Sequence, residues 1–189
     1  LLGKYPELAH KKIILYAPTF RGNSFRESYN DKALDFIKIK EQFGSEYAFL
    51  IKLHPHIANS LSFTEEEKEL LKGFVFDISK TVLIDTALCS ADILITDYSS
   101  LIFEYALLKR PMVFYAYDLE KYNGDRSFFY PYEGFVPGKI VKDTDELIEA
   151  LKEAEKGKNE KVLSEFAEKF MSSCDGKSTK RVFERFIKN

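Results

Sequence analysis

Residues 91–111 read ADILITDYSSLIFEYALLKRP, and this stretch decides the fold of the chain. Its apolar run at residues 93–95 is typical of a buried parallel strand, and Thr96 and Asp97 end that run. An amphipathic segment then starts at Ser99. A buried strand that leads directly into a helix is the repeating unit of a parallel α/β sheet, so the stretch predicts one such unit.

The join between this strand and its helix predicts an anion site. Ser99 and Ser100 bring hydroxyl groups to the first turn, where backbone N–H groups lack intrahelical partners and the helix dipole adds partial positive charge. A phosphate suits such a site, and Glu104 is placed to meet a ribose attached to it. Plain N-capping by Asp97, Ser99 and Ser100 stays open as an alternative, as does an ordinary surface glutamate at position 104.

The remaining sequence repeats the alternation of strand and helix. Apolar runs predict strands at residues 12–17, 47–53, 74–76, 92–96, 112–117 and 139–141. We expect helices at residues 31–42, 64–72, 81–90, 99–109, 143–156, 160–172 and 178–188, and a long aromatic loop at 118–138. This order predicts a single α/β domain over residues 1–189, with a Rossmann-like parallel sheet and helices on both faces.

The composition of the chain argues against several classes of protein. The chain has 189 residues and a formal net charge of −2, so we expect no nucleic-acid partner of the kind that a basic patch binds. Cys89 and Cys174 lack metal-ligand spacing and are expected to be free thiols. No apolar run approaches the length of a membrane span. Because the chain begins without Met, we expect it to be a fragment of a larger protein.

Polar residues follow each of the first four predicted strands. They are Thr19 and Arg21, His54 and His56, Asp77 and Ser79, and Asp97 with Ser99 and Ser100. Because ligands of parallel sheets bind at the carboxyl ends of the strands, these residues predict one shared site.

Two of these side chains could bind a phosphate, each with a plainer alternative. The planar guanidinium of Arg21 matches two phosphate oxygens, although a solvated loop arginine is the alternative. His54, held in an extended conformation by Pro55, can donate to a phosphate or act as a general acid or base, or can simply bond to backbone. No Cys or carboxylate near His54 and His56 completes a zinc site.

The other candidates are less specific. The position of Asp77 predicts a contact with a base or ribose, and Ser79 caps the following helix or contacts the nucleotide. The aromatic segment 115–135 covers a ligand or a partner domain, or forms a satellite hydrophobic cluster. The basic helix expected at 178–188 touches an anionic membrane surface or presents a solvated face.

Four segments resemble a known family when taken in order. They are ILYAPTFR (14–21), LIKLHPH (50–56), residues 91–122 and EGFVPGKIV (133–141). Together they resemble the CDP-glycerol:poly(glycerophosphate) glycerophosphotransferases over about residues 12–155. The resemblance implies the C-terminal, nucleotide-binding lobe of a two-lobed GT-B fold.

The same resemblance implies roles for individual residues. Ser99, Ser100 and Arg21 would hold the donor pyrophosphate, and His54 would assist the departing CMP. Asp77, Ser79 and Asp97 would lie near the nucleotide, and Glu104 at the ribose. Arg126 lies where the family tends to show a basic residue before an aromatic stretch and would bind the donor, with Ser127 where the family leads us to expect Gly.

The expected reaction transfers glycerol phosphate from CDP-glycerol, or a related CDP-alditol, to a polymer acceptor with release of CMP, as in teichoic acid or capsule synthesis. The family's second catalytic histidine lies in the N-terminal lobe, so we expect the isolated chain to be inactive. The resemblance requires no cofactor, with Mg²⁺ left open, and implies a cytoplasmic protein at the inner membrane face. A GT-B glycosyltransferase using a nucleotide-sugar donor and a non-catalytic nucleotide-binding module remain alternatives.

Overall fold

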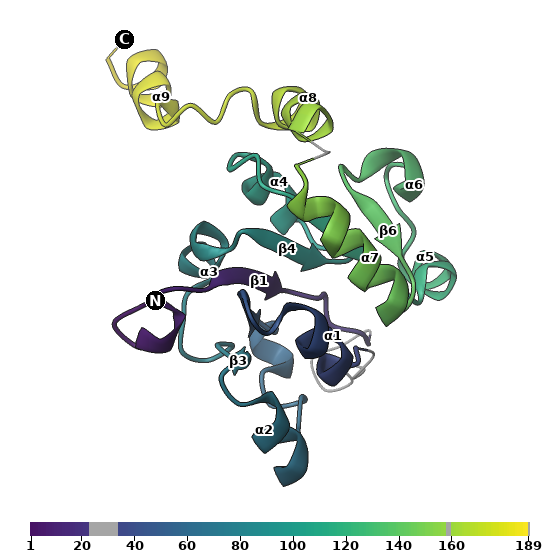
Figure 1. The fold of residues 1–189 in the computed structure, drawn as a ribbon. Helices are drawn as coiled ribbons and strands as arrows, with labels where there is room; N and C mark the ends of the chain where they lie inside the picture. Colours follow the sequence, from purple (N-terminus) through teal and green to yellow (C-terminus); the bar gives the residue numbers. More distant parts are fainter. Residues whose placement is uncertain (23–33, 158–159, 189) are drawn as a thin grey trace.

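The fold is built on one parallel sheet of six strands. A computed structural model of the chain describes residues 1–22, 34–157 and 160–188. The strands are β1 (Lys12–Tyr16), β2 (Tyr47–Ile51), β3 (Val75–Asp77), β4 (Ile93–Thr96), β5 (Met112–Tyr115) and β6 (Lys139–Val141). They lie in the order β3-β2-β1-β4-β5-β6 and every neighbouring pair is parallel (Figure 1). This is the order of doubly wound nucleotide-binding folds, and it reverses direction between β1 and β4.

Helices cover both faces of the sheet (Figure 1). The elements are η1 (Pro6–Leu8), α1 (Phe36–Phe43), η3 (Pro55–Ile57), α2 (Glu65–Leu71), α3 (Ile84–Ser90), α4 (Leu101–Ala106), α5 (Leu119–Arg126), α6 (Tyr132–Phe135), α7 (Thr144–Glu155), α8 (Glu160–Met171) and α9 (Ser178–Phe186). Alternate strand residues point to opposite faces. Ile14 therefore packs in one core with α1 and α7, and Leu15 in the other with α3, α4 and α8.

Most predicted elements are confirmed, with bounds that shift by a few residues. Helix α1 begins at Phe36, capped by Asp35, whose side chain accepts from the Lys38 amide, and the predicted start at 31–33 lies outside the described residues. The predicted capping box of α2 is present, because Thr64 and Glu67 each accept from the other's backbone amide. Helices α3 and α4 are shorter than predicted, since they begin at Ile84 and Leu101.

The prediction of a loop over residues 118–138 is wrong, because this segment folds into α5 and α6. Part of its aromatic set packs onto the core: Tyr132 is buried and contacts the rings of Phe114 and Phe128, whereas Phe129 is 94% exposed. The sequence of α5 has little helical amphipathicity and the helix buries no residue, so the spacing of its apolar residues does not predict it.

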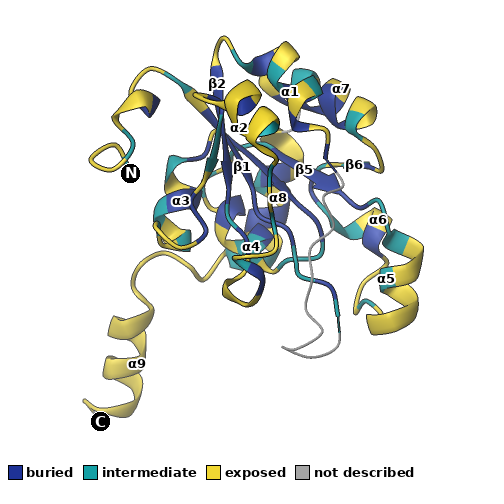
Figure 2. Ribbon diagram, turned by 90° about the horizontal axis from the view of Figure 1, so that it is seen from below, coloured by how far each residue is buried: buried dark blue, intermediate teal, exposed yellow. Residues whose placement is uncertain are grey.

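The C-terminal helices differ in how they contact the rest of the fold. Helix α8 packs on α4, where the rings of Phe103 and Phe166 stack at 5.6 Å. Helix α9 projects away from the other elements and is exposed along its length (Figure 2). Both Cys89 and Cys174 are free, as predicted, and both are exposed. Within the described ranges, no helix is long and apolar enough to span a bilayer.

Candidate functional site

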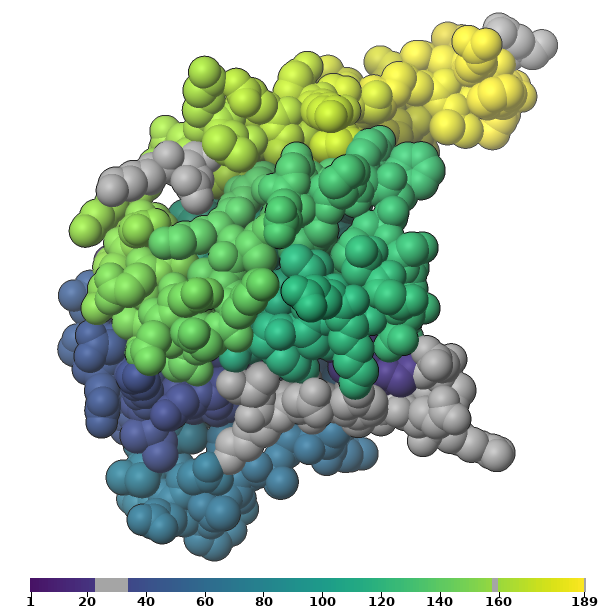
Figure 3. Space-filling model, turned by 90° about the vertical axis from the view of Figure 1, so that its right-hand side faces the viewer, coloured from purple at the N-terminus to yellow at the C-terminus, as the bar shows by residue number. Residues whose placement is uncertain are grey.

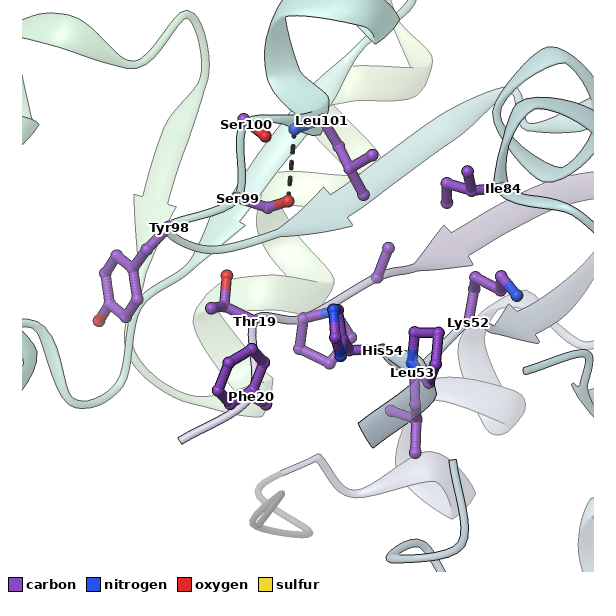
Figure 4. Close-up of a pocket in the computed structure, with 13 residues that line it drawn as sticks. Thr19, Phe20, Lys52, Leu53, His54, Ile84, Tyr98, Ser99, Ser100 and Leu101 are labelled. Atoms are coloured by element: carbon purple, nitrogen blue, oxygen red, sulfur yellow. Dashed lines mark hydrogen bonds between the residues drawn. The ribbon is translucent and has the colours of Figure 1, made fainter. Parts of the chain in front are cut away.

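A cavity of about 390 Å³ lies at the carboxyl ends of β1, β2 and β4, where the strand order reverses (Figure 4). Of the described residues, these line it: Ala17, Pro18, Thr19, Phe20, Lys52, Leu53, His54, Pro55, Ile84, Tyr98, Ser99, Ser100 and Leu101. The prediction that polar strand ends converge therefore holds for the ends of β1, β2 and β4. Doubly wound sheets bind their ligands at this position.

The turn between β4 and α4 forms one wall of the cavity. Ser99 Oγ accepts a hydrogen bond from the Leu101 amide at 3.3 Å, so it satisfies one of the amides at the helix start. Ser100 is exposed, and its side chain makes no capping hydrogen bond. Both serines line the cavity, and Ser99 also caps the turn locally.

His54 reaches the same cavity from the end of β2, on the other side from Ser99 (Figure 4). Its Nδ1 accepts from the His56 amide at 3.2 Å, so the neutral ring carries its proton on Nε2. Burial, and then the charge of His56, lower the pKa of His54, which favours that neutral form. The ring lies 4.9 Å from that of Phe20. A neutral Nε2–H is a hydrogen-bond donor suited to a phosphate oxygen.

Arg21 is buried and holds two carboxylates instead of lying open to the cavity. Its Nε and Nη2 donate to Asp118 at 2.6 and 2.9 Å, and its Nη1 donates to Asp97 Oδ2 at 2.9 Å and to the Thr19 carbonyl at 2.6 Å. The alternative of a solvated arginine is wrong, since only 7% of the residue is exposed. In this structure the guanidinium fork predicted for a phosphate is occupied by Asp118.

Asp97 does not line the cavity itself but holds two residues of its wall, Thr19 and Tyr98. It is 3% exposed and accepts from the Thr19 and Tyr98 amides at 2.8 and 2.7 Å as well as from Arg21. Burial raises the pKa of Asp97, against the attraction of Arg21 and the bond from Thr19. Since three donors converge on it, we assign it as a carboxylate.

Asp118 is the second carboxylate of this cluster. Burial alone would raise the pKa of Asp118, but hydrogen bonds from Arg21 and from the Tyr98 hydroxyl at 2.8 Å outweigh burial and lower it. The Tyr98 ring lines the cavity and lies 5.1 Å from the Arg21 guanidinium. The cluster therefore holds Thr19 and Tyr98 in place on the cavity wall.

Ser79 and Asp77 organise the end of β2 rather than a helix. The prediction that Ser79 caps the next helix is wrong, because α3 starts five residues later, with Leu83 at its N-cap. Ser79 Oγ is buried and accepts from the Leu53 amide at 3.0 Å, and Asp77 accepts from the Ser79 amide at 2.9 Å. These bonds fix the backbone next to His54. A contact of either side chain with the nucleotide stays a prediction.

Glu104 and Arg126 lie outside the described lining of the cavity. Glu104 is exposed on α4, and its contact with a ribose stays a prediction. Arg126 ends α5, donates to the Gly22 carbonyl and lies 5.3 Å from the ring of Phe20, which lines the cavity. Ser127 has a φ of 43°, in the region that favours glycine, so the Gly expected there has a conformational reason.

Sequence reasoning did not single out Lys52, Tyr98 or Asp118 as site residues. Lys52 lines the cavity and donates from Nζ to the Ser79 carbonyl at 2.7 Å. The sequence could have indicated Lys52, because it lies two residues before His54. In an extended chain, side chains two residues apart point to the same side. Within residues 1–22, 34–157 and 160–188, no group of three or more His, Cys, Asp or Glu side chains is arranged to hold a metal ion.

Sheet order and cavity position define this chain as a doubly wound α/β lobe of the nucleotide-binding type. It belongs to the family described as CDP-glycerol:poly(glycerophosphate) glycerophosphotransferase, whose profile it matches over residues 1–188. The predicted family and the predicted Rossmann-like fold of the GT-B type are thereby confirmed.

Individual relatives agree with this assignment. The chain is 40% identical to a teichoic acid poly(ribitol-phosphate) polymerase of Bacillus spizizenii, over 99% of this chain and 29% of that protein. It is 37% identical to a teichoic acid poly(glycerol phosphate) polymerase of the same organism, over 94% and 45%. A variant of the wall teichoic acid polymerase TagF soaked with CDPG matches with a TM-score of 0.76 and 30% identity, over 95% and 44%. The chain thus spans less than half of each of these proteins.

Proposed function

We propose that this chain is the donor-binding lobe of a phosphotransferase that takes alditol phosphate from CDP-glycerol or CDP-ribitol. The cavity between β1 and β4, lined by His54, Ser99 and Ser100, is the observation that carries the proposal. Family membership supports it, as does the likeness to a TagF variant soaked with CDPG. The acceptor polymer, the second lobe and catalytic turnover belong to the proposed whole protein.

In this proposal the diphosphate of the donor lies against the β4–α4 turn. Ser99 and Ser100 offer hydroxyl groups there, and His54 offers its Nε2–H from the other side of the cavity. Thr19 and Tyr98, fixed through Asp97, shape the wall between them. Because Thr19 and Tyr98 are held by hydrogen bonds to Asp97 before any ligand arrives, little reorganisation of this wall accompanies binding.

The proposed reaction is an in-line phosphoryl transfer. A hydroxyl oxygen of the acceptor attacks the β-phosphorus, and a new P–O bond forms as the P–O bond to CMP breaks. The bonding electrons leave with the bridging oxygen, which becomes a phosphate oxygen of CMP. His54 is positioned to donate its Nε2–H to that departing phosphate, while the base that accepts the hydroxyl proton belongs to the other lobe. Catalysis then rests on positioning and charge stabilisation.

Location at the inner face of the cell membrane is part of the same proposal. It is supported by α9, which is exposed and carries Val182, Phe183 and Phe186 among basic residues. Sedimentation of the chain with anionic vesicles, compared with neutral ones, tests this part. Equal recovery in the supernatant with both vesicle types would contradict it.

Isothermal titration calorimetry tests the donor assignment. We expect CDP, CDP-glycerol or CDP-ribitol to bind, and UDP-N-acetylglucosamine to bind far more weakly. His54→Gln should weaken binding, and His10→Gln, at an exposed position before β1, is the matched control. Binding of the UDP-sugar alone would favour a nucleotide-sugar glycosyltransferase, and binding of none of these ligands would refute the proposal.

A further inference from the structure

The ionisable groups behind the cavity wall, and His54 in it, carry no net positive charge that would attract an anion. The buried cluster behind the wall combines the positive Arg21 with the negative Asp97 and Asp118, so it is negative overall. Partial burial, and then His56, lower the pKa of His54, which favours its neutral form. A diphosphate carries two or more negative charges, and neither group compensates for them. A further positively charged side chain among the described residues at the cavity would supply this charge.

Lys52 meets this requirement by position. Among the thirteen described residues that line the cavity, Lys52 is the only lysine or arginine. It directly follows β2 and lies at the end of the cavity away from Tyr98 (Figure 4). Its Nζ donates to the Ser79 carbonyl at 2.7 Å. Because an ammonium group has three donors, this bond anchors the side chain and leaves donors for a ligand.

The Ser79 carbonyl that accepts from Lys52 is itself held in place. The Ser79 carbonyl belongs to a residue that is 5% exposed, whose own hydroxyl oxygen accepts from the Leu53 amide at 3.0 Å. The Lys52 ammonium is thus tied to the same segment that fixes the backbone before His54. Burial lowers the pKa of Lys52, and Asp77 only partly opposes this. A partly desolvated ammonium gains from an anion next to it.

We propose that Lys52, and not Arg21, supplies the positive charge that holds the diphosphate of a nucleoside diphosphate in this cavity. The inference deepens the function proposed above and rests on it. Lys52 contacts the ligand, whereas Arg21 acts as a positioning residue through Asp97 and Asp118. In the space-filling view of Figure 3, α9 (yellow) lies at the edge of the molecule. None of its basic residues is among the described residues that line the cavity.

The test compares Lys52→Met with Lys52→Arg and with Lys80→Met. Lys80 is a matched control, because it is exposed in the neighbouring loop and its amine donates to Asn59 outside the described cavity lining. Calorimetry with CDP, cytidine and inorganic pyrophosphate, each at low and high salt, gives the affinities. The thermal midpoint of each variant reports whether it is folded.

We expect Lys52→Met to bind CDP about tenfold or more weakly, as for the loss of a charged hydrogen bond, with a smaller dependence on salt. Cytidine binding should not change. Lys52→Arg should retain most of the CDP affinity, and Lys80→Met should match the unsubstituted chain. A purely structural role for Lys52 would lower the thermal midpoint without changing the dependence on salt.

The outcomes separate this inference from the proposed function. If the unsubstituted chain binds CDP and Lys52→Met binds it within about twofold, the role of Lys52 is refuted while the donor site stands. If CDP does not bind but pyrophosphate binds and depends on Lys52, the proposed donor is wrong and the anion-binding lysine stands. If neither ligand binds the unsubstituted chain, both proposals fail.

Discussion

Replacing Arg21 by Met removes the only described cation that neutralises the buried Asp97 and the partly buried Asp118. Asp97 is 3% exposed and the Asp118 side chain 14% exposed, so neither can recover its lost partner from bulk water. Breaking a buried ion pair by removing one member costs about 3–5 kcal/mol. For a domain of this size each kcal/mol shifts the thermal midpoint by about 2–4 °C, so we expect a decrease of about 6–20 °C.

The pH dependence of this loss follows from the same geometry. In the variant, burial without a counter-ion raises the pKa of Asp97 and Asp118 above that of an unfolded aspartate. The folded variant then binds more protons than the unfolded chain, so its stability increases as pH falls from 7 toward 5. In the unsubstituted chain the lowered pKa of Asp118 acts in the opposite direction, and Arg21 limits the rise in the pKa of Asp97. The difference in free energy of unfolding should therefore shrink as pH falls.

Urea and thermal unfolding at several pH values measure this difference. Arg181→Met is the matched control, because Arg181 also pairs with an aspartate, Asp175, but both side chains are nearly half exposed. Exposed pairs contribute little, so the control should unfold like the unsubstituted chain. A loss in Arg21→Met no larger than in the control, or a loss that grows toward pH 5, would refute the reasoning.

Three further predictions concern single contacts. Ser127→Gly should raise the thermal midpoint by roughly 2–4 °C, since relief of an unfavourable φ contributes about 1 kcal/mol; a lower midpoint would contradict the strain assigned to this residue. Ser79→Ala should destabilise the fold by about 1–3 kcal/mol in urea unfolding, because the Leu53 amide loses its buried acceptor, and unchanged stability would show that the bond is dispensable. CDP affinity of the unsubstituted chain should change little between pH 7 and 8 and rise below pH 6.5, because the lowered pKa of His54 keeps that ring neutral until acid pH; calorimetry across this range checks it, and His54→Gln should abolish the rise.

The sequence was sufficient for the sheet and for the place of the site. Short apolar runs such as residues 93–95 have a period and length that mark buried strands, and parallel strands bring their carboxyl ends to one edge. The sequence alone therefore predicts that three residues lie close together: His54, Ser99 and Ser100. Their common position depends on topology alone, and topology follows from the alternation of elements.

The partner of Arg21 could not be obtained in this way. Asp118 lies 97 residues further along the chain, and nothing in the local pattern of either residue encodes their pairing. The two helices in residues 118–138 were missed for a related reason. α5 lacks an apolar stripe, and the packing of Tyr132 against Phe114 and Phe128 becomes visible only in three dimensions.

The position of a bound diphosphate tests the central claim most directly. A crystal structure of the chain with CDP should place both phosphorus atoms in the cavity between β1 and β4. Phosphate oxygens should lie within hydrogen-bond reach of Ser99, Ser100 and Lys52, with Arg21 still on Asp97 and Asp118. A diphosphate bound elsewhere on the chain, or one that displaces Asp118 from Arg21, would contradict the account.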